Sequence, residues 1–277
     1  MTFLDRILSF AKNYDLVRLV VMNGSRVNSN ITPDKFQDYD LVFYVNNYKD
    51  FIKDVTFIYS LGEVLVKQTS LDQRDGFEGI DESFIYMLQY KDGNKLDLTV
   101  RDVSYFEMDF KEDSLSKILL DKEGLNFRNN PNESSYYVKP IDNKSFYFSV
   151  NEFYWVCLYV FKGIARDNLF YAIKHLNIIR EELENIIDWW IGEKHNYKIA
   201  VGKGKSRYKD LLNNNLFEMY KNTYPGLEKK SLWDSTICAI KLFDLLANHL
   251  AIMHNYDYPT TIKEDIIDFI NKNYSIN

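Results

Sequence analysis

Short runs of apolar, often β-branched residues alternate with polar segments along the first half of the chain. Such runs, bounded by turn-forming residues, are typical of buried strands. The run over 17–22 stops at Asn23-Gly24-Ser25, as a buried strand does when it enters a turn. The same pattern predicts further strands over 39–45, 63–67, 83–90 and 95–100. The residues between the last two, Lys91 to Asn94, include a glycine and are typical of a hairpin loop.

Helical spacing of apolar residues marks the start of the chain and most of its second half. Leu4, Ile7, Leu8 and Ala11 recur on one helical face and predict an amphipathic N-terminal helix. Beyond about residue 140 the spacing is helical almost throughout, with further helices expected over 232–254 and after Thr261. We therefore predict an α+β or α/β N-terminal domain with a mixed sheet over 1–140, and an all-helical domain over 141–277.

Two helix starts in the second half are predicted from capping residues. Ser149 and Glu152 have the spacing of a capping box, which would open a helix that ends near Gly163. Asp167 is a suitable cap for the next helix, which would run to about Gly192.

Composition and charge exclude several classes of protein. The chain has 277 residues, of which 46% are hydrophobic and 27% charged, as in globular proteins with two ordinary cores. The 40 acidic and 34 basic side chains give a formal charge of −6, which argues against a general nucleic-acid binder. The acidic balance suits a cationic small substrate instead.

Location and redox environment are predicted from cysteine usage and from the N-terminus. Cys157 and Cys238 stand alone, which excludes a Cys-rich zinc site and favours a reducing compartment. No run approaches the roughly 20 apolar residues of a membrane helix. Asp5 and Arg6 interrupt the apolar N-terminal stretch, so no signal peptide is expected. We expect a cytoplasmic protein with no membrane partner.

The candidate chemistry begins at the turn after the first strand. Asp38 and Asp40 project to one face of the second strand, roughly 7 Å apart along the chain, and repel each other unless a cation lies between them. Magnesium prefers carboxylate oxygens and brings substrate phosphates as its remaining ligands. Gly24 would allow the backbone to approach a phosphate closely, and Ser25 would supply a hydroxyl and an amide.

A third carboxylate is expected on the same polar face. In the strand over 95–100, Leu96 and Leu98 face the core, so Asp97 faces the other way. If this strand lies beside the second one, three carboxylates converge. Three acids around two metal ions are the equipment for in-line attack at a phosphoryl group, with Asp97 as the base for the attacking hydroxyl.

Together these strings resemble the DNA polymerase β-like nucleotidyltransferase superfamily, which is marked by Gly-Ser, then Asp-x-Asp, then a later strand Asp. They resemble most its aminoglycoside 6-adenylyltransferase branch, over the segments 21–26, 36–40, 92–99, 115–122 and 153–167. The resemblance implies a polymerase-β-like N-terminal fold. It also implies transfer of AMP from ATP to a streptomycin hydroxyl at position 6, with release of pyrophosphate.

The resemblance also implies roles for particular residues. Ser25, with its neighbours Gly24 and Arg26, would hold the terminal phosphates of ATP, the co-substrate. Asp38 and Asp40 would hold two Mg²⁺ ions, with Asp97 as third ligand or base.

Candidate residues in the helical domain each have an ordinary structural alternative. Lys203 and Lys205 could reach the triphosphate, or belong to a solvated loop; their segment is no P-loop, because the earlier glycine position is Ile199. Glu152 and Asp167 could bind the guanidinium groups of streptomycin, or serve only as helix caps. Trp155 could contact the same substrate, although aromatic residues at helical spacing are more often core.

Two other functions remain open at this point. The same chemistry could act on another acceptor, such as a lincosamide or a protein hydroxyl. Alternatively, the chain could be a non-catalytic nucleotide-binding module or a toxin–antitoxin partner. The oligomeric state is left open, and a monomer is possible.

Overall fold

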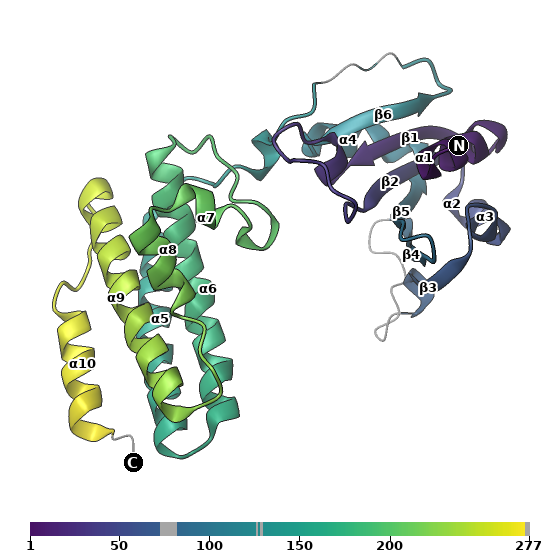
Figure 1. Ribbon diagram of the computed structural model, residues 1–277. Helices are drawn as coiled ribbons and strands as arrows, with labels where there is room; N and C mark the ends of the chain where they lie inside the picture. The colour runs from purple at the N-terminus through teal and green to yellow at the C-terminus, as the bar shows by residue number, and fades with distance from the viewer. Residues whose placement is uncertain (73–81, 126, 128–129, 275–277) are drawn as a thin grey trace. The chain divides into compact units, whose positions relative to one another are not determined.

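The computed structural model describes residues 1–72, 82–125, 127 and 130–274 (Figure 1). The chain forms two compact units, Met1–Ser135 and Tyr136–Asn277. The short helix η4 (Ser134–Tyr136) contains the boundary between them.

The first unit is built on a six-stranded sheet in its described part. The strand order is β3-β4-β5-β2-β1-β6, and β2 and β5 are parallel whereas the other neighbours are antiparallel. The strands are β1 (Val17–Asn23), β2 (Tyr39–Val45), β3 (Val64–Thr69), β4 (Ser83–Tyr90), β5 (Lys95–Asp102) and β6 (Ser116–Asp121). The predicted mixed sheet is confirmed, as is the hairpin that joins β4 to β5.

Helices cover both faces of this sheet. Phe3, Ile7 and Ala11 of the N-terminal helix pack with one set of strand residues, and Phe106 packs with the opposite set, which includes Leu19. The helical elements are α1 (Phe3–Asn13), η1 (Gly24–Val27), α2 (Tyr48–Phe51), α3 (Thr56–Ser60), η2 (Ser70–Asp72), η3 (Val103–Tyr105) and α4 (Phe106–Glu112). Helices α1, α2 and α3 contribute to the first core and α4 to the second, because alternate strand residues point to opposite faces.

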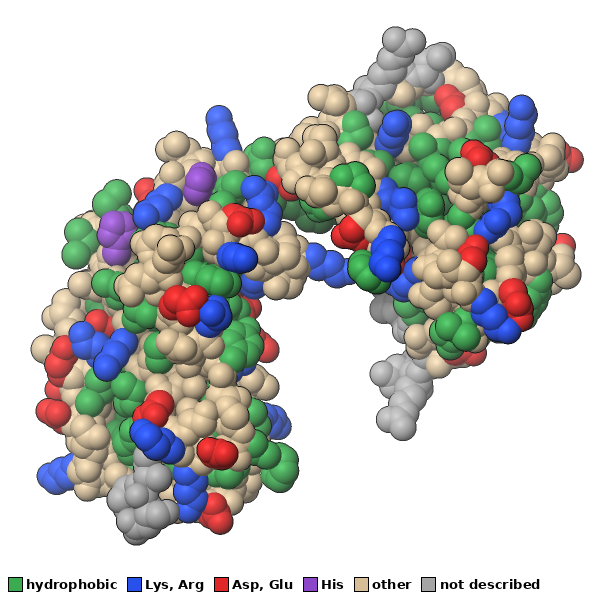
Figure 2. All heavy atoms as spheres, in the orientation of Figure 1, with side chains coloured by type: hydrophobic (Ala, Val, Ile, Leu, Met, Phe, Trp, Pro, Cys, Tyr) green, Lys and Arg blue, Asp and Glu red, His purple; other side chains and the backbone are tan. Residues whose placement is uncertain are grey.

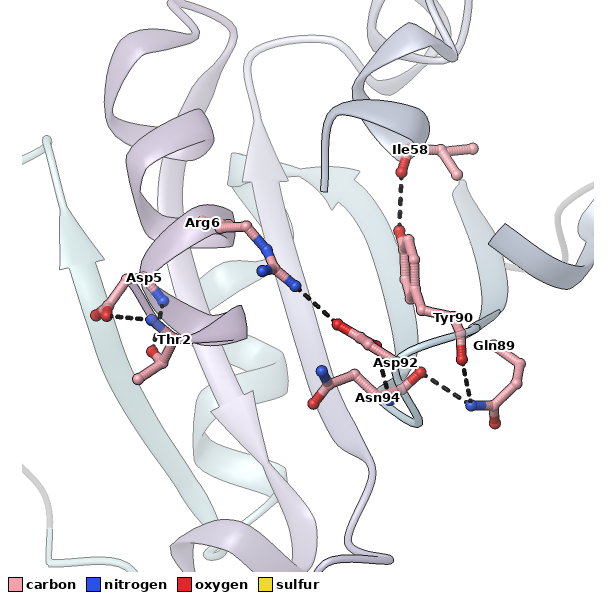
Figure 3. Close-up of polar contacts among 8 residues, drawn as sticks. All are labelled: Thr2, Asp5, Arg6, Ile58, Gln89, Tyr90, Asp92 and Asn94. Atoms are coloured by element: carbon pink, nitrogen blue, oxygen red, sulfur yellow. Dashed lines mark hydrogen bonds and ion pairs between the residues drawn. The ribbon is translucent and has the colours of Figure 1, made fainter. Parts of the chain in front are cut away.

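Polar contacts hold the turn between β4 and β5 against α1 and α3 (Figure 3). Arg6 Nη2 lies 3.0 Å from Asp92 Oδ2 in the turn, and the Tyr90 hydroxyl donates to the carbonyl of Ile58 at 3.0 Å. The Gln89 side-chain amide donates to the carbonyls of Tyr90 and Asn94. These contacts fix the turn that leads into β5, the strand that carries Lys95 and Asp97.

The second unit is helical throughout its described residues, as expected for the C-terminal domain. Helices α5, α6 and α9 contact one another and contribute most of its single core cluster. Its elements are α5 (Asn143–Ala165), α6 (Leu169–Lys194), η5 (Lys203–Lys205), α7 (Tyr208–Leu211), α8 (Asn214–Lys221), α9 (Lys229–His254) and α10 (Ile262–Asn273).

The predicted capping box at Ser149 and Glu152 is wrong. Helix α5 begins at Asn143, and the carboxylate of Asp142 accepts the hydrogen bond from the Ser145 amide. Ser149 is buried in the helix interior, and Glu152 is exposed on the same helix. The side chain of Asp142 accepts a hydrogen bond from the first turn of α5, so the helix begins about two turns before the position that the capping box predicts.

The predicted cap at Asp167 is also wrong. The side chain of Asn168 accepts from the Tyr171 amide and caps α6, while Asp167 adopts a left-handed backbone with φ of 57°. Its carboxylate lies 3.3 Å from Lys229 Nζ. Asp167 therefore reverses the chain between α5 and α6, and the residue after it supplies the cap.

Helix α9 is the one described helix that is long and apolar enough to cross a membrane by composition alone. Half of its apolar window is buried inside this unit, and Leu232, Ile240, Phe243 and Leu250 lie in the core. Its apolar character is accounted for by packing among the other helices.

Candidate active site

Three polar residues form a row across three neighbouring strands. Asn23 at the end of β1 pairs with Asp40 of β2, and Asp40 pairs with Asp97 of β5. Paired residues of adjacent strands point to the same face. The apolar neighbours of Asp97, Leu96 and Leu98, are fully buried in the opposite core. The row therefore lies on the sheet face that carries α4, and the predicted meeting of Asp40 and Asp97 is confirmed.

Asp38 and Lys95 add a charge cluster beside the row. Each precedes an aspartate of the row by two residues, so each points to the same face. The Lys95 ammonium lies 2.7 Å from Asp38 Oδ2 and 2.8 Å from Asp97 Oδ2. Lys95 thus bridges two of the three predicted metal ligands.

The bridge keeps Lys95 charged. Partial burial disfavours the ammonium, but the hydrogen bonds and charges of Asp38 and Asp97 outweigh it and raise the pKa of Lys95 to about 12. The side chain remains 36% exposed, so solvent reaches the bridge.

The glycine of the turn makes room for Asp40. Gly24 has φ of +74°, and a Cβ at this position would lie 2.6 Å from Asp40 Oδ2. The Gly24 amide donates to the carbonyl of Leu115 at 3.1 Å, which ties the turn to the segment before β6. The turn and the carboxylate are therefore packed against each other.

Arg26 and Ser25 fasten the loop that precedes β2. The Arg26 guanidinium donates to the carbonyls of Asp38 at 2.9 Å and Gln37 at 2.7 Å, and it lies 3.6 Å from the ring centre of Tyr39. The Gln37 side-chain amide donates to the Ser25 carbonyl. In this arrangement the Arg26 guanidinium positions Asp38 by holding its backbone carbonyl.

The site fits a divalent cation by its donor chemistry and by two buried oxygens. Asp97 Oδ1 and Asn23 Oδ1 are buried, and neither has a hydrogen-bond partner within the described part of the chain. Carboxylate and amide oxygens are the ligands that Mg²⁺ prefers. Among the described residues no group of three or more acids, His or Cys is already arranged around an ion position. The ammonium of Lys95 lies between Asp38 and Asp97 instead.

The lysines of the Gly/Lys segment lie in the second unit and differ from each other. Lys205 forms an ion pair with Asp188 of α6, whose other oxygen accepts from the Tyr208 hydroxyl. Lys203 is exposed at the start of η5. Of these two lysines, Lys205 is held by an ion pair, and Lys203 forms none with the residues that the structure describes.

Glu152 lines a pocket between α5 and α6, with a volume of about 510 Å³. Glu182 and Asn185 of α6 contribute polar groups, and Phe148 and Trp189 contribute aromatic rings. Two carboxylates with aromatic walls suit a planar cation, because a guanidinium binds carboxylates and stacks on rings.

Trp155 lines a second, more apolar pocket of about 620 Å³ against α10. Its indole is 62% exposed, so the residue is no core aromatic, and Asn151 lines both pockets. Asp167 lines neither pocket. Ala165, at the end of α5, lies thirteen positions after Glu152, which is about 20 Å of helix. The structure does not bring Asp167 together with Glu152 and Trp155.

Several residues of these sites, among them Asn23, Lys95, Glu182 and Trp189, were not singled out from the sequence. Asn23 and Lys95 lie within recognised motifs, and the period of two along a strand places Lys95 on the face of Asp97. Glu182 and Trp189 required knowledge of which face of α6 meets α5, which local spacing does not supply.

The sequence is similar to known proteins over nearly its whole length. The family profile described as streptomycin adenylyltransferase matches residues 1–273. The chain is 34% identical to an aminoglycoside 6-adenylyltransferase of Bacillus subtilis over 259 residues, 92% of this chain and 91% of the relative. It is 32% identical to a Staphylococcus aureus protein of the same name, over 98% of this chain and 97% of the relative.

A solved structure adds to these relatives. The chain is similar to the crystal structure of an aminoglycoside 6-adenyltransferase from Bacillus subtilis, with 28% identity, a TM-score of 0.47, and coverage of 98% of this chain and 96% of that one. The family match and the two curated relatives span nearly all of this sequence. This chain belongs to the streptomycin adenylyltransferase family of nucleotidyltransferases.

Proposed function

We propose that this enzyme transfers AMP from Mg-ATP to a hydroxyl of streptomycin, at position 6 as in the relatives named 6-adenylyltransferases, and releases pyrophosphate. The observation that carries the proposal is the row of Asn23, Asp40 and Asp97, with Asp38 beside it at the Gly24–Ser25 turn. The family match supports an aminoglycoside as the acceptor class.

The carboxylates would hold the metal and accept the proton. Asp38, Asp40 and Asp97 are the residues that would bind two Mg²⁺ ions. When bound, the ions would neutralise the negative charge of the phosphates. The acceptor oxygen forms a bond to the α-phosphorus as the bond to the pyrophosphate oxygen breaks, and the hydroxyl proton passes to Asp97.

The turn after β1 would position the nucleotide. Ser25 would offer its backbone amide and its hydroxyl to the phosphates next to the carboxylates, and Gly24, whose amide is bound to the Leu115 carbonyl, would let the backbone come close to them. Arg26 supports this arrangement indirectly, because its guanidinium holds the backbone of Asp38. Lys203 is the better candidate of the two lysines for a phosphate contact, since Lys205 is paired with Asp188.

The pocket between α5 and α6 would receive the guanidinium groups of streptomycin. Glu152 and Glu182 supply negative charge, and Trp189 supplies a ring on which a planar cation stacks. On the face drawn in Figure 2, Lys and Arg are interspersed with Asp and Glu on both units. The overall charge of −6 favours encounter with a cationic drug.

The proposal is tested by pyrophosphate release from purified protein, Mg-ATP and a panel of acceptors. Streptomycin should be adenylylated, whereas an aminoglycoside without guanidinium groups, a lincosamide and casein should react far more slowly. Glu182→Gln should raise KM for streptomycin about tenfold with kcat little changed, because it removes a ground-state contact. Glu181→Gln, a neighbouring exposed acid outside the pocket, is the matched control.

Preference for a lincosamide or casein would overturn the choice of acceptor. ATP binding with no turnover on any acceptor would favour the non-catalytic nucleotide-binding module.

A further inference from the structure

Lys95 occupies the position at which a cation is needed in the candidate active site. Asp38 and Asp97 both direct Oδ2 to its ammonium, at 2.7 and 2.8 Å. Two carboxylates that share one cation at these distances repel each other strongly once it leaves. The same two oxygens belong to the residues that would bind the divalent ions of the proposed function.

The fold presents Lys95 for this role and leaves it able to move. It lies two residues before Asp97 on β5, so both side chains leave the strand on one face. The side chain is 36% exposed and has four methylene groups, so its ammonium can leave the carboxylates without disturbing the buried core. Its neighbour Leu96 is fully buried and holds the strand in place.

The oxygen that Lys95 does not use points to a second cation partner. Asp97 Oδ1 is buried and has no hydrogen-bond partner among the described residues. A buried carboxylate oxygen without a partner is costly, and a metal ion would satisfy it. Lys95 therefore neutralises the aspartate pair only in part.

We propose that Lys95 is a stand-in cation, which stabilises the metal-free site by bridging Asp38 and Asp97 and competes with the divalent ion for their oxygens. This inference rests on the proposed metal ligands but on no particular acceptor. It assigns Lys95 a positioning role: it keeps the two carboxylates together while no metal is bound, and it weakens metal binding in the absence of nucleotide.

The test measures Mn²⁺ affinity of the full-length protein without nucleotide or acceptor, by electron paramagnetic resonance of the free ion. Lys95→Met should lower the Kd for Mn²⁺ about tenfold, because two part-exposed ion pairs no longer compete. Lys95→Arg keeps a cation at the bridge and should stay within about threefold of wild type. Lys91→Met is the control, since Lys91 lies on the same hairpin and pairs with Glu63 instead.

A second readout follows the stability of the metal-free protein. In EDTA, Lys95→Met should lower Tm more than Lys91→Met does, and saturating Mn²⁺ should close that gap. Equal or weaker Mn²⁺ binding by Lys95→Met would overturn the proposal. So would a gain of the same size in Lys91→Met, which would reflect net charge alone.

Failure of this inference is distinguishable from failure of the proposed function. If Lys95→Met binds Mn²⁺ as wild type does while the wild-type protein adenylylates streptomycin, only the stand-in role is wrong. If Lys95→Met binds Mn²⁺ more tightly but no aminoglycoside is modified by wild type, the stand-in role holds and the proposed function is wrong.

Discussion

At the residue scale, the missing side chain of Gly24 decides where Asp40 can lie. The turn needs a positive φ, and the carboxylate occupies the space that a Cβ would fill. Glycine therefore meets two demands here, on the backbone conformation and on the packing of a functional group.

Gly24→Ala should separate these demands when it is compared with Gly124→Ala. Both glycines have a similar positive φ, but a Cβ at Gly124 meets nothing within 4 Å. We expect each substitution to cost about 1 kcal/mol of stability from backbone strain. Only Gly24→Ala should also lower kcat, by about 100-fold, because it displaces Asp40.

These effects are measured by thermal unfolding and by pyrophosphate release. An equal loss of activity in Gly24→Ala and Gly124→Ala would show that the packing of Gly24 against Asp40 does not affect catalysis.

Asp97→Asn should abolish turnover and leave the fold intact. The amide keeps the shape of the side chain but cannot accept the proton, and loss of a general base typically costs 10²–10⁴ in rate, roughly. The far-UV circular dichroism spectrum should match that of Asp50→Asn, an exposed acid of the same unit that serves as the control. Wild-type rates from Asp97→Asn would exclude it as the base.

The direction of a side chain could be predicted where the two-residue period of a strand sets it. The burial of Leu96 and Leu98 indicates the direction of Asp97, and the structure confirms it. The bridge through Lys95 was not predicted, because it depends on β2 lying beside β5, and the residues that pair across these strands, such as Asp40 and Asp97, are 57 positions apart in the chain.

At the element scale, helix starts were the least predictable feature. Two cap sequences compete at the start of α5, and the earlier one, Asp142 with Ser145, is used. Ser149 and Glu152 match a capping box equally well in sequence. Buried apolar residues that precede them, such as Phe146, extend the helix toward its N-terminus. Tertiary packing thus decided between two locally acceptable signals.

Asp142→Ala should destabilise the protein, because it leaves the first amides of α5 without an acceptor. Glu152→Ala, in the exposed middle of the same helix, should change stability by less than about 0.5 kcal/mol. Chemical denaturation of both variants measures the difference. A larger loss of stability in Glu152→Ala than in Asp142→Ala would favour the capping box at Ser149 and Glu152 instead.

At the scale of the whole molecule, each unit has cores of its own. The core cluster of the helical unit draws its residues from 141–270, and the two clusters of the sheet unit draw theirs from 3–106. Composition and the change of pattern near residue 140 indicated this division. The strand order was not predictable, because pairing between distant segments leaves no local signal.

Residues 136–277 expressed alone should fold. Their core comes mostly from α5, α6 and α9 and includes no residue of the sheet unit, so a cooperative thermal transition and a helical circular dichroism spectrum are expected. A fragment without such a transition would show that the helical core is not self-sufficient.

The shared row of Asn23, Asp40 and Asp97 also constrains how this gene can change length. One codon inserted between Asn94 and Asp97 would shift the alternation of side chains in β5, turning the aspartate inward and a leucine toward the face that carries Asp40. Insertions confined to the turn at 91–94 leave the alternation intact. Length variants that keep resistance should therefore carry their insertions and deletions in turns such as this one, and not within β2 or β5.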